Sequence, residues 1–173
     1  MNSLLLKNTT RAVIFILLQG FVLQRINIGG ASFNYFSLIM YPVVIMLLPI
    51  QTSRAALVLI GFALGMSVDL IYGSLGVHAS ACLFIAFTRP MILRFMEPRG
   101  GYPIPSSPLA ASFGLRWFIQ YASLMLILYL LFYFSVEVFS FKFIGQILIK
   151  TVSSFVLSLF AILAYIMLFN PKS

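Results

Sequence analysis

The sequence predicts an all-α integral membrane protein with six transmembrane helices and both termini in the cytoplasm. Three observations lead to this prediction. The 173-residue chain is 62% hydrophobic and only 8% charged, whereas soluble domains carry about 25% charged residues. Its apolar residues fall into runs close to the length of about 20 residues that a membrane-spanning helix needs. Its 11 Lys and Arg residues, against 3 Asp and Glu, are concentrated in every second connection between those runs.

Six apolar segments are the expected helices. We find no internal repeat and no low-complexity tract, so residues 1–173 form one predicted domain. The Tyr41-Pro42 pair predicts a kink in the second helix, and the sixth helix is long enough to tilt. The six segments are Thr10–Leu23, Phe33–Pro49, Ala55–Tyr72, Val77–Leu93, Leu115–Phe134 and Phe143–Phe169.

The first segment is short enough to be compared with a secretion signal. Lys7 and Arg11 precede it, as basic residues precede the apolar part of a signal peptide. Polar residues, Gln24 and Arg25 among them, follow it without an A-x-A cleavage site. We therefore expect a retained membrane anchor.

The basic residues also predict the orientation. With a cytoplasmic N-terminus, the outer loops carry only Arg25 and Lys142, and Lys150 falls inside the sixth helix. This is a strong positive-inside bias. The cytoplasmic segments and helix ends then carry Lys7, Arg11, Arg54, Arg89, Arg94, Arg99, Arg116 and Lys172.

Two connections have a distinctive composition. Gly73 and Gly76 enclose a tight outer turn, so the third and fourth helices should form an antiparallel hairpin. The cytoplasmic loop Glu97–Pro108 has four prolines and two glycines, and we expect it to be extended and semi-rigid. It is either a plain linker or a docking strip for a cytoplasmic partner.

One acidic residue lies inside an apolar helix. Gly61, Gly65, Asp69 and Gly73 are spaced by four, so they share one helix face. A carboxylate at membrane depth is costly and indicates a functional site. Glycines on the same face allow another backbone to approach closely.

The topology places further polar groups at the depth of Asp69. His78 begins the fourth helix, and Lys150 lies about two turns into the sixth. We expect Lys150 to pair with Asp69, and the alternative is that its long stem reaches the outer headgroups without a partner. The residues spaced by four around Lys150 should face protein; they are Gln146, Ser154 and Ser158.

The residue types needed for catalysis are scarce. The chain has one His, one Cys and three acids, with no paired carboxylates at glycosidase-like spacing and no phosphate-binding glycine motif. His78 and Cys82 are four apart, but Asp69 is the nearest third ligand, so we expect no metal. Nor is there a pattern for reading nucleic-acid bases. The sequence predicts a protein that is not an enzyme and has no cofactor.

The segment Gly61–Ala79 resembles the MreD family, the membrane subunit of the bacterial rod-shape system, or elongasome. The pattern is G-x-x-x-G-x-x-x-D-L-x-x-x-x-x-G-x-H-A. The residues that carry it are Gly61, Gly65, Asp69, Leu70, Gly76, His78 and Ala79, with Gly73 also present. Elsewhere the chain matches the family in length, helix count and basic cytoplasmic side, and its proline-rich loop departs from the family.

The resemblance implies a non-enzymatic scaffold in the bacterial inner membrane. Such a protein binds MreC, works with a peptidoglycan polymerase and a class B penicillin-binding transpeptidase, and has MreB filaments on its cytoplasmic face. It supports lateral peptidoglycan synthesis and rod cell shape.

Members of this family are also similar in fold to the substrate-binding subunits of energy-coupling-factor importers, which have six helices around an outward-facing pocket. Asp69 and His78 would then lie near the mouth of the pocket. The alternative function is therefore that of a substrate-binding subunit of a small-molecule, vitamin-type importer.

Overall fold

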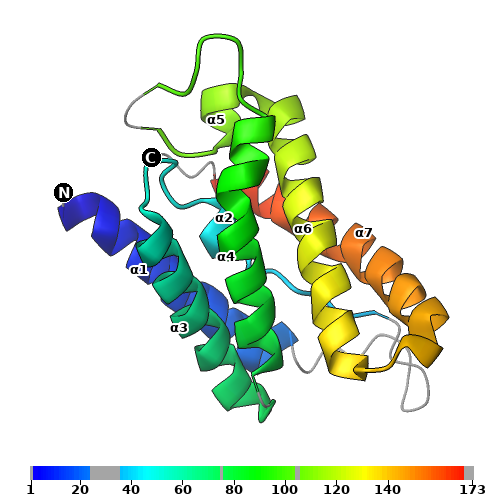
Figure 1. Ribbon diagram of the computed structural model, residues 1–173. Helices are drawn as coiled ribbons and strands as arrows, with labels where there is room; N and C mark the ends of the chain where they lie inside the picture. Colours follow the sequence, from blue (N-terminus) through cyan, green and yellow to red (C-terminus); the bar gives the residue numbers. More distant parts are fainter. Residues whose placement is uncertain (1, 24–35, 75, 104–105, 170–173) are drawn as a thin grey trace.

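A computed structural model describes residues 2–23, 36–74, 76–103 and 106–169, and these form an all-helical structure (Figure 1). Among them, three helices are long and apolar enough to cross a membrane: α3 (Arg54–Tyr72), α6 (Leu115–Val138) and α7 (Ile144–Phe169). The other helical elements are α1 (Asn2–Leu17), its π-helical continuation η1 (Leu18–Val22), α2 (Val43–Met46), α4 (Val77–Phe95), α5 (Ala110–Phe113) and the 3-10 turn η3 (Phe141–Phe143).

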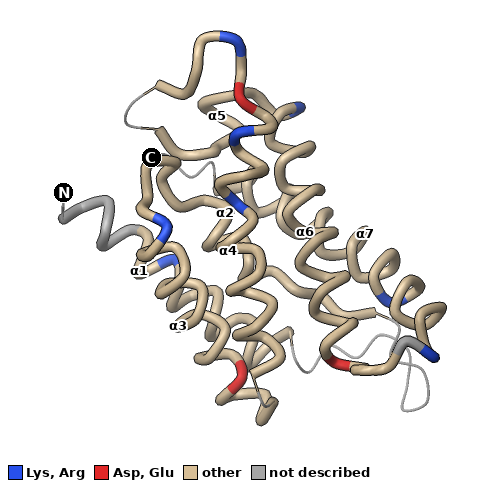
Figure 2. Tube along the Cα trace, in the orientation of Figure 1, with Lys and Arg blue, Asp and Glu red and all other residues tan. Residues whose placement is uncertain are grey.

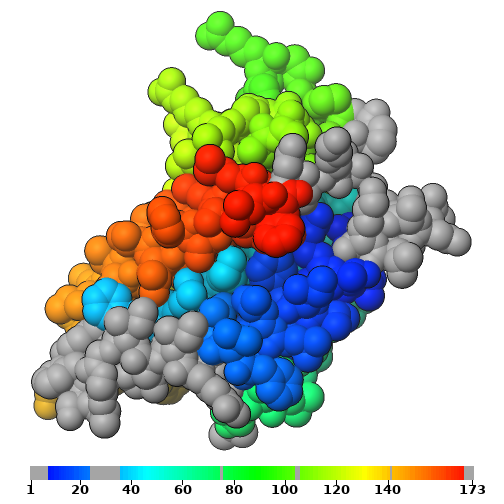
Figure 3. Space-filling model, turned by 180° about the vertical axis from the view of Figure 1, so that it is seen from behind, coloured from blue at the N-terminus to red at the C-terminus, as the bar shows by residue number. Residues whose placement is uncertain are grey.

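The helices form two layers with a short helix between them. The hairpin of α3 and α4 packs against α6 in one layer (Figure 1). Seen from behind, α1 and α7 lie across the other side, with residues of the 36–50 segment at the seam between them (Figure 3). Helix α2 lies in the interior, and all four of its side chains are buried. The core is therefore centred on α2.

Four of the expected helices are confirmed with small shifts at their ends. The segments expected at 55–72, 77–93, 115–134 and 143–169 correspond to α3, α4, α6 and α7. The first helix begins at Asn2 instead of Thr10, and α6 runs four residues beyond Phe134. In both places polar residues continue the helix past the apolar run, because backbone hydrogen bonding does not stop where hydropathy changes.

The expected second helix, 33–49, is wrong. Residues 33–35 lie outside the described part of the chain, and within 36–49 only Val43–Met46 is α-helical. A proline disfavours the helical conformation for the residue before it and cannot donate a backbone hydrogen bond, although α4 accommodates one at Pro90. Pro42 and Pro49 therefore confine the helix to one short stretch. Residues 36–42, which we call the strap, are non-helical.

The loop between α4 and α6 is held against the helices. The indole nitrogen of Trp117 donates to the backbone oxygen of Met96 (3.0 Å), and the Tyr102 hydroxyl donates to that of Leu93 (2.7 Å). These two side chains satisfy carbonyls at the end of α4 that have no partner within the helix. The described residues of 97–108 contain no helix, as expected.

Charged residues are unevenly distributed along the bundle. Lys and Arg gather at the end where α3 and α6 begin and α4 ends (Figure 2). Arg54 begins α3, Arg94 lies in the last turn of α4, and Arg116 lies in the first turn of α6. We call this the cationic end. Asp69 and Glu137 lie towards the opposite end of the bundle, because each is near the far end of its helix.

Candidate functional site: a capped hairpin and a buried strap

Asp69 caps the helix that follows its own. Its two carboxylate oxygens accept hydrogen bonds from the backbone amides of His78 (3.0 Å) and Ala79 (2.8 Å), and one also accepts from the Ser74 hydroxyl (2.5 Å). The side chain is 2% exposed. An anion at a helix N-terminus satisfies amides that have no partner within the helix and interacts favourably with the helix dipole. The expectation that protein surrounds Asp69 is confirmed.

The glycines of the same face bring the two helices of the hairpin together. A Cβ atom added at Gly65 would lie 2.5 Å from the Cα of Ala79, and one added at Gly61 would lie 3.0 Å from the Cβ of Ala86. Only a residue without a side chain fits at Gly65. This close approach carries the first turn of α4 to within hydrogen-bonding distance of Asp69. The glycine face is thus occupied by α4 of the same chain.

The turn between the two helices also depends on glycine. Gly73 and Gly76 have φ values of 67° and 82°, in the left-handed region that other residues rarely adopt. Gly73 ends α3, and its backbone amide donates to the carbonyl of Asp69. The predicted reversal at these two glycines is confirmed.

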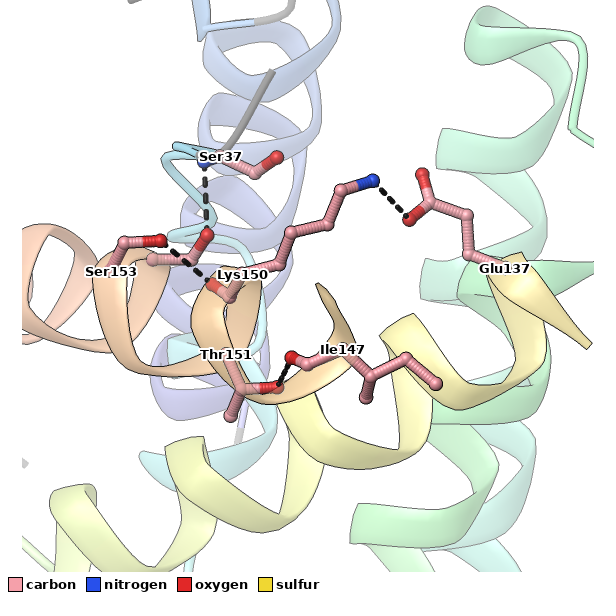
Figure 4. Close-up of polar contacts among 7 residues, drawn as sticks. Ser37, Glu137, Ile147, Lys150, Thr151 and Ser153 are labelled. Carbon is pink, nitrogen blue, oxygen red and sulfur yellow. Dashed lines mark hydrogen bonds and ion pairs between the residues drawn. The ribbon is translucent and has the colours of Figure 1, made fainter. Parts of the chain in front are cut away.

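The expected pair between Lys150 and Asp69 is wrong. The Lys150 ammonium lies 3.4 Å from Glu137 on α6, and the two side chains are 24% and 40% exposed (Figure 4). Asp69 instead directs both oxygens to the start of α4. The physical reason is that α7 packs on α6, whereas the Asp69 side chain reaches nearer donors across its own hairpin. The expectation that Gln146 faces protein is also wrong, since its side chain is exposed.

Two serines of α7 bind the strap. Ser154 and Ser158 are fully buried. Ser154 accepts a hydrogen bond from the backbone amide of Ser37 (3.0 Å; Figure 4), and Ser158 accepts one from that of Ile39 (2.9 Å). The expectation that these serines face protein is confirmed. They supply acceptors for backbone amides that the non-helical strap does not use internally.

Gln19 of η1 binds the strap from the other side. Its amide oxygen accepts from the backbone amide of Met40 (3.0 Å), and its amide nitrogen donates to the carbonyl of Leu38 (3.0 Å) and to the Tyr72 hydroxyl (3.0 Å). Gln19 is 2% exposed. Gln19 was not among the predicted site residues, although a glutamine inside an apolar helix was a usable signal.

Tyr41, near the end of the strap, joins it to α4 and α6. The Tyr41 hydroxyl is hydrogen-bonded to Nδ1 of His78 (2.9 Å) and to the Tyr129 hydroxyl. Tyr41 and Tyr129 are fully buried, and His78 is 2% exposed. Their rings also meet edge to face. His78 therefore connects the Asp69 cap, through its backbone, to the strap, through its ring. In the described residues, no three His, Cys, Asp or Glu side chains form a metal-binding group.

The other end of α2 is held by Arg89, which was predicted to lie at a cytoplasmic helix end. Arg89 is fully buried inside α4. Its Nη2 donates to the carbonyl of Leu48, and its Nε donates to the Tyr121 hydroxyl (3.1 Å). Tyr121 in turn donates to the carbonyl of Met46 (3.0 Å). The guanidinium and the phenol thus satisfy carbonyls at the C-terminal end of α2.

An apolar groove lies on the outer side of the bundle. It has a volume of about 730 Å³ and is lined by Phe36 and by residues of α7 from Leu148 to Leu157. No charged side chain lines it. Asp69 and the strap residues Ser37 and Ile39, whose backbone amides bind the serines of α7, are not among its lining residues.

Comparison with known proteins gives no relative for this arrangement. No family model matches the chain, and no curated protein and no solved structure is significantly similar to it. The function is therefore inferred from the residues and their contacts.

Proposed function

We propose that this protein is a non-enzymatic scaffold of the bacterial elongasome, resembling MreD, that lies in the inner membrane and binds MreC. In this role it supports lateral peptidoglycan synthesis and rod cell shape, together with the polymerase, the class B penicillin-binding transpeptidase and MreB. The observation that carries the proposal is that the pattern resembling MreD coincides with one structural unit. Gly65, Asp69 and Gly76 each have a specific part in joining α3 to α4.

The proposed topology has both termini in the cytoplasm and the cationic end inside. The concentration of Arg54, Arg94 and Arg116 at one end supports it, because basic residues are retained on the cytoplasmic side. The proposal keeps six membrane segments, and in the second the strap backbone from Ser37 to Met40 is hydrogen-bonded to η1 and α7. Such irregular backbone is tolerated at membrane depth where protein surrounds it.

The contacts of the strap explain how such a protein could hold its partners in fixed positions. Gln19, Tyr41 and Ser154 join helices that are far apart in the sequence. Polar networks that are fully hydrogen-bonded favour a single packing arrangement. Exposed apolar side chains on α3, α4 and α7 then present surfaces for partner helices; examples are Leu59, Phe87 and Val156.

The importer alternative receives less support from the contacts. It requires polar groups that converge on a pocket. Asp69 is engaged by α4, Lys150 by Glu137, and Gln146 is exposed. The groove on α7 is apolar. We therefore favour the scaffold.

Photocrosslinking in cells tests the proposal. A photoreactive phenylalanine analogue is placed at Leu59, Phe87 or Val156 in turn, and at the fully buried Ile85 as the matched control. We expect at least one exposed position to capture MreC and the Ile85 position to capture nothing. Depletion of the protein should also make rod cells round. Absence of MreC from all three exposed positions, in cells with normal width after depletion, would refute the scaffold.

A further inference from the structure

Arg89 is the least compensated charge in the interior. Its Nε and Nη2 atoms donate to Tyr121 and to the carbonyl of Leu48, with a longer contact of 3.5 Å to that of Pro49. Its Nη1 is buried and has no hydrogen-bond partner among the described residues. A buried donor without a partner is rare in native proteins and requires an explanation.

The chain has too few acids to neutralise this cation. It contains three in total. Asp69 caps α4, Glu137 pairs with Lys150, and Glu97 is exposed on the loop after α4. Carbonyl dipoles offset only part of the cost of burying a guanidinium, and a buried charge ordinarily has a counter-charge. None of the three acidic side chains therefore supplies a counter-charge to Arg89.

A second unpartnered group lies beside the same backbone. The hydroxyl of Ser106 is buried and has no partner among the described residues. The Ser106 carbonyl accepts from the amide of Ile50 (2.9 Å), and Ile50 follows Pro49, whose carbonyl is the longer contact of Arg89. Two unused donors, the Arg89 Nη1 and the Ser106 hydroxyl, thus flank one short stretch of chain. Both groups complement an oxyanion.

The surroundings attract anions. Arg54, Arg94 and Arg116 are exposed at the cationic end, where Arg89 is about two turns from the end of α4. Clustered basic residues raise the local concentration of anions, and basic pockets between membrane helices bind anionic lipid headgroups.

We propose that Arg89 and Ser106 form a binding site for a phosphate group, supplied by an anionic phospholipid headgroup or by a free phosphate ion. The planar guanidinium matches phosphate oxygens, which also accept from a hydroxyl. Ser106 begins a stretch, residues 106–109, that forms no regular secondary structure before α5. Ser106 is held there by the Ile50 bond and by a 3.3 Å bond from its amide to Gln51. This site is at the opposite end from the Asp69 cap, so its failure leaves the scaffold proposal intact.

Thermal unfolding and native mass spectrometry of the full chain in detergent test the site. The probes are phosphatidylglycerol, phosphatidylcholine and inorganic phosphate, each titrated separately. We expect phosphatidylglycerol, or inorganic phosphate alone if the free ion is the source, to raise the Tm and to remain bound. Ser106→Ala, which leaves the helices intact, should weaken that binding about 10- to 100-fold, as expected for the loss of one hydrogen bond to a charged group. Arg89→Lys should weaken it further, because the ammonium lacks the planar fork.

Lys142→Gln is the matched control, since Lys142 is an exposed cation in η3, away from the cationic end. It should bind the phosphate group as the unchanged protein does. Binding by the Ser106 and Arg89 variants equal to that of the unchanged protein would overturn the proposal, as would loss of binding in the Lys142 variant alone. A Tm that responds equally to phosphatidylcholine, or to none of the three probes, would overturn it too.

Discussion

Replacing Asp69 by leucine should remove the cap that joins α3 to α4. Leucine has the same branched shape as aspartate, although its methyl groups are larger than the oxygens, and it suits a membrane helix, so the substitution mainly deletes the acceptor oxygens. The amides of His78 and Ala79 and the Ser74 hydroxyl would lose their shared acceptor. Asp69 and His78, which lie on either side of this turn, are each 2% exposed. Water can therefore replace the lost hydrogen bonds only in part.

The magnitude follows from these contacts. A hydrogen bond to a charged group contributes about 1.5–3 kcal/mol, and an N-cap substitution costs about 0.5–2 kcal/mol. The three bonds share one carboxylate and are not additive, so we expect Asp69→Leu to cost about 2–4 kcal/mol. Asp69→Asn keeps one acceptor oxygen and should cost about 1–2 kcal/mol.

Thermal unfolding in detergent, followed by size-exclusion chromatography, measures this order. The control is Glu137→Gln, which changes an acid that is exposed and pairs with Lys150 at 3.4 Å. Exposed ion pairs contribute about 0–1 kcal/mol, so this variant should be nearly neutral. A Tm for Asp69→Leu equal to that of the unchanged protein, or a greater loss for Glu137→Gln, would refute the capping argument.

Three further predictions concern packing, the strap and pH. Gly65→Ala should destabilise by about 1–3 kcal/mol, because its Cβ meets backbone, whereas Gly145→Ala, with open space around it, should be neutral or stabilising; comparison of their Tm values checks this. Ser154→Ala should cost about 1–3 kcal/mol by leaving a strap amide unpaired, and the same measurement on Ser135→Ala, whose hydroxyl bonds only within its own helix, should show a smaller loss. Burial, with a smaller contribution from the nearby Glu97, raises the pKa of Tyr102 to about 12. The stabilisation provided by the neutral Tyr102 phenol is therefore complete below pH 10 and declines as the pH rises towards 12. Tyr102→Phe should weaken this decline in unfolding curves measured at alkaline pH.

Hydropathy and glycine spacing were sufficient to predict much of the α3–α4 hairpin. The helices predicted at 55–72 and 77–93 end within two residues of the observed ends. These helix ends depend on neighbours in the sequence, as do the reversal at Gly73 and Gly76 and the enclosure of Asp69 by protein. The capping of α4 spans only ten residues, from Asp69 to Ala79. Local periodicity and turn chemistry contain this information, because the interacting groups are brought together by one short connection.

Contacts between distant segments were decided by the tertiary structure alone. Tyr41-Pro42 indicated a kink. The non-helical strap, however, is held by hydrogen bonds between its backbone and the side chains of Gln19 and of two serines of α7, and these serines lie more than 100 residues further along the chain. The partner of Lys150 and the burial of Arg89 were equally hidden, since a single apolar run has the same pattern whichever helices surround it. Composition and spacing thus determined that helices form in a membrane and where their glycine faces lie. Which polar groups meet depended on how those helices pack, because each unsatisfied backbone group in lipid must find its partner within the folded chain.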